Sequence, residues 1–357
     1  MSGTAPVTAP LHVETFGSGP DLVLLHGWGM HGGVWGDFAL RLAERYRVHV
    51  IDLPGHGFSA AFSAPSSHGG QNGRTAVLHG EAARRVPDRD CPACTLGWGR
   101  SKPVLNLVEG LVSATLFDSP PPVLPRGGRD AIAETSVLPA GLPPLKKGWD
   151  GENKTCLAQT LSIVLEHVPQ RAVWLGWSLG GTLAARLAAE HPERVSSLIL
   201  LACNPCFVRR PDWPWGMEAA VFETFAAEIG NNAAASLRRF GGLLCQGLDD
   251  PRFALKTLRE RLETRPAPDP HALAVGLDWL RQLDARVVLS RLSCPALLAG
   301  GDRDALVPYA ALEMLAELNP SFRLARIEGA SHVPFLSHEH ATLARLRAFL
   351  DECPAES

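Results

Sequence analysis

One hexapeptide, 176–181 (Gly-Trp-Ser-Leu-Gly-Gly), constrains the possible fold more than any other stretch of the sequence. It follows a short apolar run at 172–176, typical of a buried strand, and precedes an Ala/Leu-rich helical stretch at 182–190. A serine between glycines at a strand-to-helix turn is typical of a nucleophile elbow, because the glycines leave room for a strained turn that exposes the hydroxyl. An incidental serine in a Gly-rich turn is the alternative. The flanking strand and helix favour Ser178 as a nucleophile.

Short apolar runs bounded by Gly, Pro and Asp recur along the chain and alternate with helical stretches. The runs are 22–26, 47–53, 172–176, 197–201, 295–299 and 323–327. Continuous apolar runs of this length are typical of strands that are buried on both faces of a parallel sheet. Their alternation with helices predicts an α/β protein with a mostly parallel, doubly wound sheet.

Two segments interrupt this alternation. Residues 208–285 are helical in pattern and rich in aromatic residues, and they lie between two core strands, where we expect a helical cap, or lid. Residues 62–156 are rich in Pro, Gly, Ser and Arg. Because a long stretch without periodicity is unusual inside a compact domain, we predict an irregular, disordered insertion there. The core is then assigned to residues 1–61, 157–207 and 286–357.

Composition argues against several classes of protein. The 357 residues are 46% hydrophobic and 20% charged, a balance typical of a globular protein with a buried core. A net charge of −3 gives no indication of nucleic-acid binding. Residues 1–10 lack the pattern of a signal peptide, and no apolar run reaches the roughly 18 residues needed to span a bilayer. We therefore expect a cytoplasmic protein that does not bind nucleic acid or membrane, and we expect a monomer.

The eight cysteines are scattered through the chain and are expected to be reduced thiols. Cys91 and Cys94 form one close pair and Cys203 and Cys206 another, and four thiolates could in principle bind zinc. One pair lies in the irregular insertion and the other beside a core strand, so we predict no metal site. Serine-based hydrolysis needs no cofactor, and none is predicted.

A serine hydroxyl is a weak nucleophile unless a base removes its proton. After an elbow of this kind the partners follow in the order acid, then histidine. His332 comes directly after the last predicted strand and is the predicted general base. Asp302 and Asp304 both follow the run at 295–299, and the pattern G-x-x-D-x-x-V-P favours Asp304 as the acid that orients the imidazole. Asp302 could then pair with Arg303 or cap its own loop.

The string His26-Gly27-Trp28-Gly29 follows the first strongly apolar run. In this arrangement the loop after that strand supplies one backbone N–H to the oxyanion hole, and the residue after the nucleophile supplies the other. We therefore predict that the backbone N–H groups of Trp28 and Leu179 bind the oxyanion. Trp28 could alternatively be a packing aromatic, or could wall the acyl pocket as well.

Basic residues gather in the predicted cap. Arg252, Lys256 and Arg259 recur at i, i+4 and i+7 and share one face of a predicted helix, shortly after Arg238 and Arg239. They form either an ordinary solvated helix face or a docking surface for an acidic partner.

Six strings, taken together, resemble one known family. They are 26–29 (His-Gly-Trp-Gly), 52–57 (Asp-Leu-Pro-Gly-His-Gly), 174–181 (Trp-Leu-Gly-Trp-Ser-Leu-Gly-Gly), 191–195 (His-Pro-Glu-Arg-Val), 205–207 (Pro-Cys-Phe) and 213–214 (Trp-Pro). This combination resembles the pimeloyl-[acyl-carrier protein] methyl ester esterases of biotin synthesis, and the resemblance covers about residues 11–61 and 157–350. It implies an α/β-hydrolase fold with a helical cap. It also implies hydrolysis of the methyl ester of pimeloyl-[acyl-carrier protein], with release of methanol.

The resemblance assigns roles to individual residues. Its catalytic residues fall on Ser178, Asp304 and His332. Its substrate contacts fall on Trp28, Ser178, Leu179, Phe240, Gly241, Gly242, Leu243, Leu244 and His332. Its basic residues that bind acyl-carrier protein fall on Arg239, Arg252 and Lys256. The last replaces an arginine, and a further one meets Ala235. The family has a much shorter segment in place of the insertion, which bears on efficiency rather than on the chemistry.

Two other functions remain open for the same fold. A generalist carboxylesterase or a C–C-bond hydrolase would use the same three residues as the methyl esterase. A ligand-binding protein could keep those residues without turning over a substrate.

Overall fold

The computed structural model describes residues 11–61 and 151–353, and in the second range it describes side chains from Cys156 onward. Within these ranges a seven-stranded sheet has the order β1-β3-β2-β4-β5-β6-β7. Its strands are β1 (Val13–Phe16), β2 (Asp21–Leu25), β3 (Arg47–Ile51), β4 (Ala172–Trp177), β5 (Val195–Leu201), β6 (Ala296–Gly301) and β7 (Phe322–Ile327). Only the edge pair β1–β3 is antiparallel. The predicted mostly parallel sheet is therefore confirmed, with an antiparallel edge strand that the sequence did not indicate.

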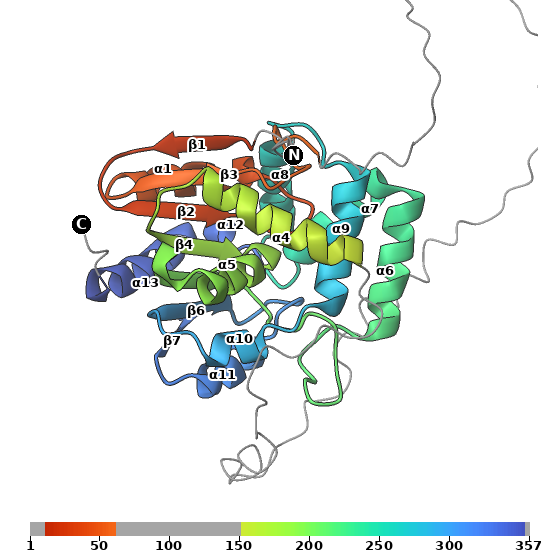
Figure 1. Cartoon of the computed structure of the whole chain (residues 1–357). Helices are drawn as coiled ribbons and strands as arrows, with labels where there is room; N and C mark the ends of the chain where they lie inside the picture. The colour runs from red at the N-terminus through yellow and green to blue at the C-terminus, as the bar shows by residue number, and fades with distance from the viewer. Residues whose placement is uncertain (1–10, 62–150, 354–357) are drawn as a thin grey trace, which may run out of the picture. The chain divides into compact units, whose positions relative to one another are not determined.

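Helices pack along the sheet (Figure 1). Outside residues 208–285 they are η1 (Gly32–Trp35), α1 (Asp37–Ala43), α4 (Gly151–Glu166), α5 (Leu179–Glu190), η2 (Pro192–Arg194), α10 (Arg286–Ser290), α11 (Tyr309–Leu318), α12 (Pro334–Ser337) and α13 (Glu339–Glu352). Every residue of β4 is buried, although successive side chains point to opposite faces. Both faces of the sheet are therefore covered there, which explains the continuous apolar run. In the described part of the chain, no helix combines the length and the apolar character needed to cross a bilayer.

The turn from β4 to α5 depends on very close backbone packing. A Cβ atom on Gly176 would lie 2.3 Å from the carbonyl oxygen of Gly180, and one on Gly180 would lie 2.4 Å from the carbonyl oxygen of Leu25. Side chains are therefore excluded where α5 meets β4 and β2. Ser178, between them, has φ 55° and ψ −121°, a conformation that costs a non-glycine residue free energy. The structure thus contains the strained strand-to-helix turn that the hexapeptide predicts.

Residues 208–285, predicted as a cap, contain four α-helices among which the cap aromatics lie. They are α6 (Ala219–Asn231), α7 (Ala233–Leu244), α8 (Pro251–Leu262) and α9 (Pro270–Gln282). Side chains cap three of their N-termini: Asn232 accepts from the N–H of Ala235, Asp250 from Phe253, and Asp269 from His271 and Ala272. Pro251 and Pro270 occupy first-turn positions, where a missing N–H costs nothing. Three of the four cap helices therefore begin at local capping signals.

Most of the predicted insertion, residues 62–150, lies outside the described residues. Its predicted end at residue 156 is wrong by six residues, because α4 begins at Gly151. The helix carries an apolar stripe at Leu157, Leu161 and Val164, all of which are buried. This stripe has helical spacing and packs the helix onto the protein.

We predict that Gly180→Ala lowers the free energy of unfolding by about 1–3 kcal/mol or more, because its Cβ would overlap the backbone of Leu25. Gly230→Ala, in α6, is the matched control, since its Cβ would meet nothing within 4 Å. Its stability should be unchanged or increase by up to about 1 kcal/mol. Urea denaturation of both variants measures the difference. Equal stability of the two would contradict the proposed packing constraint.

Candidate active site

Ser178 lies at the carboxyl end of β4 and directly before the first residue of α5. Its side chain is partly exposed, whereas its neighbours Trp177 and Leu179 are buried. The helix N-terminus behind it carries a partial positive charge, which favours negative charge that develops on a substrate. The turn therefore presents a hydroxyl to solvent in a setting suited to an anionic intermediate.

His332 and Asp304 form a direct, buried hydrogen bond. The Nδ1 atom of His332 lies 2.8 Å from Oδ2 of Asp304, and each side chain is only 1% exposed. A carboxylate accepts, so Nδ1 carries the proton and Nε2 is left with a lone pair. A histidine with a free Nε2 lone pair and a carboxylate behind it has the arrangement of a general base.

Asp304 is held in place by its own loop. Its Oδ1 atom accepts hydrogen bonds from the backbone N–H groups of Leu306 at 2.8 Å and Val307 at 2.9 Å. Asp302, the other candidate acid, is exposed and accepts from the N–H of Gly329 at 2.8 Å. The structure thus brings Asp304 to His332 and places Asp302 in a loop-capping position, the alternative weighed for it from the sequence.

The loop that carries His332 is fixed from two sides. The Nε1–H group of Trp177 donates to the carbonyl oxygen of His332 at 2.8 Å, and the two rings lie 5.8 Å apart. Ser331 donates through Oγ to the carbonyl oxygen of Leu244, at the end of α7, at 2.9 Å. The residue before the serine and the last residue of a cap helix therefore both position the base.

The loop after β2 lies directly against the elbow. A Cβ atom on Gly27 would come within 3.3 Å of Cβ of Ser178. Leu179 is the first residue of α5, so its N–H has no acceptor within the helix. This places the two predicted oxyanion residues, Trp28 and Leu179, on segments that flank Ser178.

The indole of Trp28 packs into the cap. It is 3% exposed, and its Nε1–H donates to the carbonyl oxygen of Leu273 in α9 at 3.0 Å. Its ring makes edge-to-face contacts with Phe225 and Phe240, with centroid distances of 5.5 and 5.2 Å. Trp28 is therefore the packing aromatic considered as an alternative, and its backbone N–H remains a candidate oxyanion donor.

The five cap residues assigned to substrate binding have different environments. Phe240 faces Trp28, and Leu244 is buried beside the loop of His332. Gly241 faces α8, because a Cβ there would lie 3.2 Å from Leu255. A Cβ on Gly242 would meet nothing, and Leu243 is half-buried. Phe240 and Leu244 are thus the members that the structure places beside the predicted catalytic residues.

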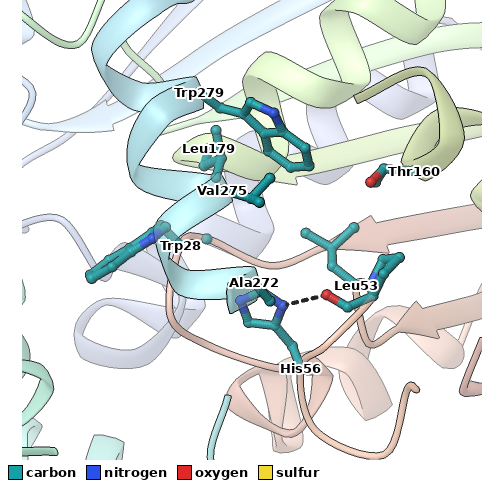
Figure 2. Close-up of a pocket in the computed structure, with 11 residues that line it drawn as sticks. Trp28, Leu53, His56, Thr160, Leu179, Ala272, Val275 and Trp279 are labelled. Atoms are coloured by element: carbon teal, nitrogen blue, oxygen red, sulfur yellow. Dashed lines mark hydrogen bonds between the residues drawn. The ribbon is translucent and has the colours of Figure 1, made fainter. Parts of the chain in front are cut away.

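A small cavity of about 10 Å³, on the order of one water molecule, is lined in part by the two predicted oxyanion residues, Trp28 and Leu179 (Figure 2). It is lined by Gly27, Trp28, Leu53, Pro54, His56, Thr160, Leu179, Ala272, Val275, Gly276 and Trp279. The α9 residues in this lining were not singled out from the sequence. Val275, Gly276 and Trp279 belong to a helical stretch in which the large aromatic Trp279 is the one sequence signal for the face that meets the core.

The cap residues assigned to carrier docking are exposed. Arg239 on α7 pairs with Glu228 at 2.7 Å, and Lys256 on α8 pairs with Glu260 at 3.7 Å. Arg252 and Lys256 border a shallow surface hollow on α8. Surface ion pairs of this kind are weak, so both cations can exchange partners readily.

The two cysteine pairs considered for zinc fall in different parts of the chain. Cys91 and Cys94 lie outside the described residues. Cys203 and Cys206 are buried, and burial raises the pKa of the Cys203 thiol to about 12 and that of Cys206 to about 11. Groups that resist deprotonation in this way are poor metal ligands.

Comparison with known proteins agrees with the geometry. Residues 20–339 match the model of the alpha/beta hydrolase fold family. A bromoperoxidase from Bacillus anthracis has a similar structure, with a TM-score of 0.65 and 20% identity over 96% of this chain and 95% of that chain. At that identity the likeness shows the fold alone. The chain belongs to the α/β hydrolases.

Two curated relatives identify the family within the α/β hydrolases to which the chain belongs. The pimeloyl-[acyl-carrier protein] methyl ester esterase of Nitrosomonas europaea is 32% identical over 92% of this chain and 95% of its own. The protein of that name from Aeromonas hydrophila is 33% identical over 95% of this chain and 98% of its own. Within the α/β hydrolases, the chain thus belongs to the pimeloyl-[acyl-carrier protein] methyl ester esterase family, and the resemblance noted in the sequence is confirmed.

We predict that Asp304→Asn lowers kcat by about 10³- to 10⁴-fold, because an amide cannot hold the imidazole in the tautomer that accepts a proton from serine. Asp302→Asn is the matched control and should keep kcat within a few-fold of wild type. Steady-state hydrolysis of a p-nitrophenyl ester measures both. A larger loss in Asp302→Asn than in Asp304→Asn would reverse the assignment of the acid.

Proposed function

We propose that the protein hydrolyses the methyl ester of pimeloyl-[acyl-carrier protein] to pimeloyl-[acyl-carrier protein] and methanol, through an acyl-enzyme on Ser178. The buried bond between His332 and Asp304 is the observation that carries the mechanism. Membership of the esterase family supports the choice of substrate.

In the first half of the reaction, Nε2 of His332 removes the proton from Oγ of Ser178 while Oγ attacks the ester carbonyl carbon. The backbone N–H groups of Trp28 and Leu179 bind the negative oxygen of the tetrahedral intermediate. The intermediate collapses by breaking the bond to the methoxy group. His332 returns its proton to that oxygen, and methanol leaves.

In the second half, a water molecule attacks the acyl-enzyme. His332 removes a proton from the water, and the new tetrahedral intermediate again places its negative oxygen at Trp28 and Leu179. Collapse breaks the bond to Oγ of Ser178, which regains a proton from His332. Pimeloyl-[acyl-carrier protein] is released with a free carboxyl group. Atoms and charges balance without a metal or a cofactor.

The substrate chain is proposed to run between the core and the cap, past Phe240 and Leu244. The volume of the cavity beside Trp28 is on the order of that of one water molecule, which is much too small for a pimeloyl chain. A chain that enters this cavity would have to move the cap side chains around Trp28 apart. Leu243, Gly241 and Gly242 complete the segment assigned to the substrate from the sequence.

The basic residues of α7 and α8 are proposed to bind the carrier. Arg239, Arg252 and Lys256 are exposed on two helices that pack on each other through Gly241 and Leu255. An acyl-carrier protein that is acidic would be attracted to them, and such contacts act mainly on association and orientation. We also propose a cytoplasmic enzyme, as the sequence predicts.

We predict that Ser178→Ala abolishes release of methanol from carrier-bound methyl ester, with a loss of about 10⁶-fold or down to the background rate, because the nucleophile is removed. Mass spectrometry of the carrier measures the loss of the methyl group. As a cellular check, the wild-type gene should restore growth without biotin to a strain that lacks this esterase, with and without residues 62–150. Hydrolysis of p-nitrophenyl esters without hydrolysis of the carrier-bound ester would instead favour a generalist esterase. No turnover of either by the wild type would favour a ligand-binding protein.

We predict that the double variant Arg239→Glu with Arg252→Glu lowers kcat/KM for carrier-bound ester by about 10-fold or more and leaves p-nitrophenyl acetate hydrolysis unchanged. Arg323→Glu on β7 is the matched charge reversal, with a similarly exposed side chain. It should spare both substrates. Equal losses on both substrates in the double variant would contradict carrier docking at this surface.

A further inference from the structure

His26 links the oxyanion loop to the neighbouring strand end and is fully buried. It follows β2 and precedes Gly27, which lies against Ser178. Its Nδ1 atom lies 2.8 Å from the carbonyl oxygen of Gly27, and its Nε2 atom lies 3.0 Å from the backbone nitrogen of Leu53. Both ring nitrogens are therefore engaged with backbone groups.

These two partners determine the protonation state of the ring. The carbonyl of Gly27 can only accept, so Nδ1 carries a proton, and the N–H of Leu53 can only donate, so Nε2 carries none. Burial, reinforced by the nearby ring of His56, lowers the pKa of His26 to about 3. The neutral Nδ1–H tautomer is thus the form that makes both hydrogen bonds, to Gly27 and to Leu53, at neutral pH.

The bond to Gly27 acts on the neighbouring residue through the peptide plane. The peptide between Gly27 and Trp28 is trans and planar, so its C=O and N–H groups point in opposite directions. Fixing the carbonyl on the side of His26 therefore fixes the N–H of Trp28 on the other side. Met30 adds a second, longer bond to the same carbonyl, at 3.3 Å.

We propose that His26 is a positioning residue that orients the N–H of Trp28 for the oxyanion. The inference rests on the proposed function, since it assumes that Trp28 is an oxyanion donor. His26 does not touch the substrate in this scheme. It prevents rotation of the peptide plane, which would turn the N–H away and present a carbonyl oxygen to the developing negative charge.

Three substitutions separate this role from simple packing. The side-chain nitrogen of asparagine lies near the place of Nδ1, whereas the end of glutamine lies near the place of Nε2. His26→Asn can therefore keep the bond to Gly27, and His26→Gln keeps only the partner at Leu53. His26→Ala keeps neither.

We expect His26→Gln and His26→Ala to lose about 10- to 100-fold in kcat on p-nitrophenyl acetate with KM unchanged, because an oxyanion donor acts in the transition state. His26→Asn should lose less than about fivefold. Binding of a boronic acid, which mimics the tetrahedral intermediate, should weaken in parallel with kcat. His49→Asn is the matched buried-histidine control and should keep kcat, since His49 lies in the middle of β3 and contacts Thr15 and Asp21, the first residue of β2.

Two results would overturn the proposal. The first is equal activity of the Asn and Gln variants once kcat is divided by the fraction of sites titrated with a fluorophosphonate. The second needs no variant: in ¹⁵N NMR of the wild-type full chain, His26 should be the Nδ1–H tautomer and should not titrate between about pH 5 and 8. An Nε2–H tautomer excludes the bond to Gly27, because Nδ1 would then have no proton to donate. Titration in that range would contradict the Leu53 N–H donating to Nε2. If the wild-type protein hydrolysed no ester at all, that result would instead refute the proposed function.

Discussion

Close backbone packing of α5 on the sheet is the constraint on which the site depends. Gly176, in β4, and Gly180, at the start of the helix, leave no room for a Cβ: one on Gly176 would overlap the carbonyl of Gly180, and one on Gly180 would overlap the carbonyl of Leu25 in β2. Ser178 must then adopt a positive φ, and the free energy cost is met by the packing around it. The same contact brings the loop after β2, Ser178 and the helix N-terminus together. One packing requirement thus assembles groups from separate parts of the chain.

The cap and the core are joined by polar contacts as well as by aromatic packing. Arg265, in the loop before α9, donates to Oδ1 of the fully buried Asp52 at 2.8 Å. Asp52 also accepts from the N–H groups of Gly32 and Phe58, and together these donors lower its pKa against the effect of burial. A buried carboxylate without such partners would strongly destabilise the fold. The cap is therefore attached close to the loop that carries Trp28.

Much of the fold followed from local patterns. Six of the seven strands coincide with predicted apolar runs, and three of the four cap helices begin at capping residues that the sequence displays. The edge strand β1 was missed because it is short and only half-buried, so it carries no continuous apolar run. The end of the insertion was predicted six residues late, at 156, because residues 151–155, in the first turns of α4, are as polar as the insertion. The composition of a segment indicates its average exposure to solvent, and it does not indicate at which residue the helical hydrogen bonds begin.

For the proposed site, the sequence alone determined the strained turn at Ser178 and pointed to His332 and to Asp304 over Asp302, because each follows a strand and carries a local motif. Only the tertiary structure decided which side chains of α9 face the core and that Trp28 bonds to Leu273. It also showed that the ring of His26 forms a hydrogen bond with the carbonyl oxygen of Gly27. These contacts join residues far apart in the chain or depend on the rotation of one peptide plane. Periodicity and spacing along the sequence do not encode long-range contacts or the rotation of a peptide plane, because the packing of the helices and strands sets them.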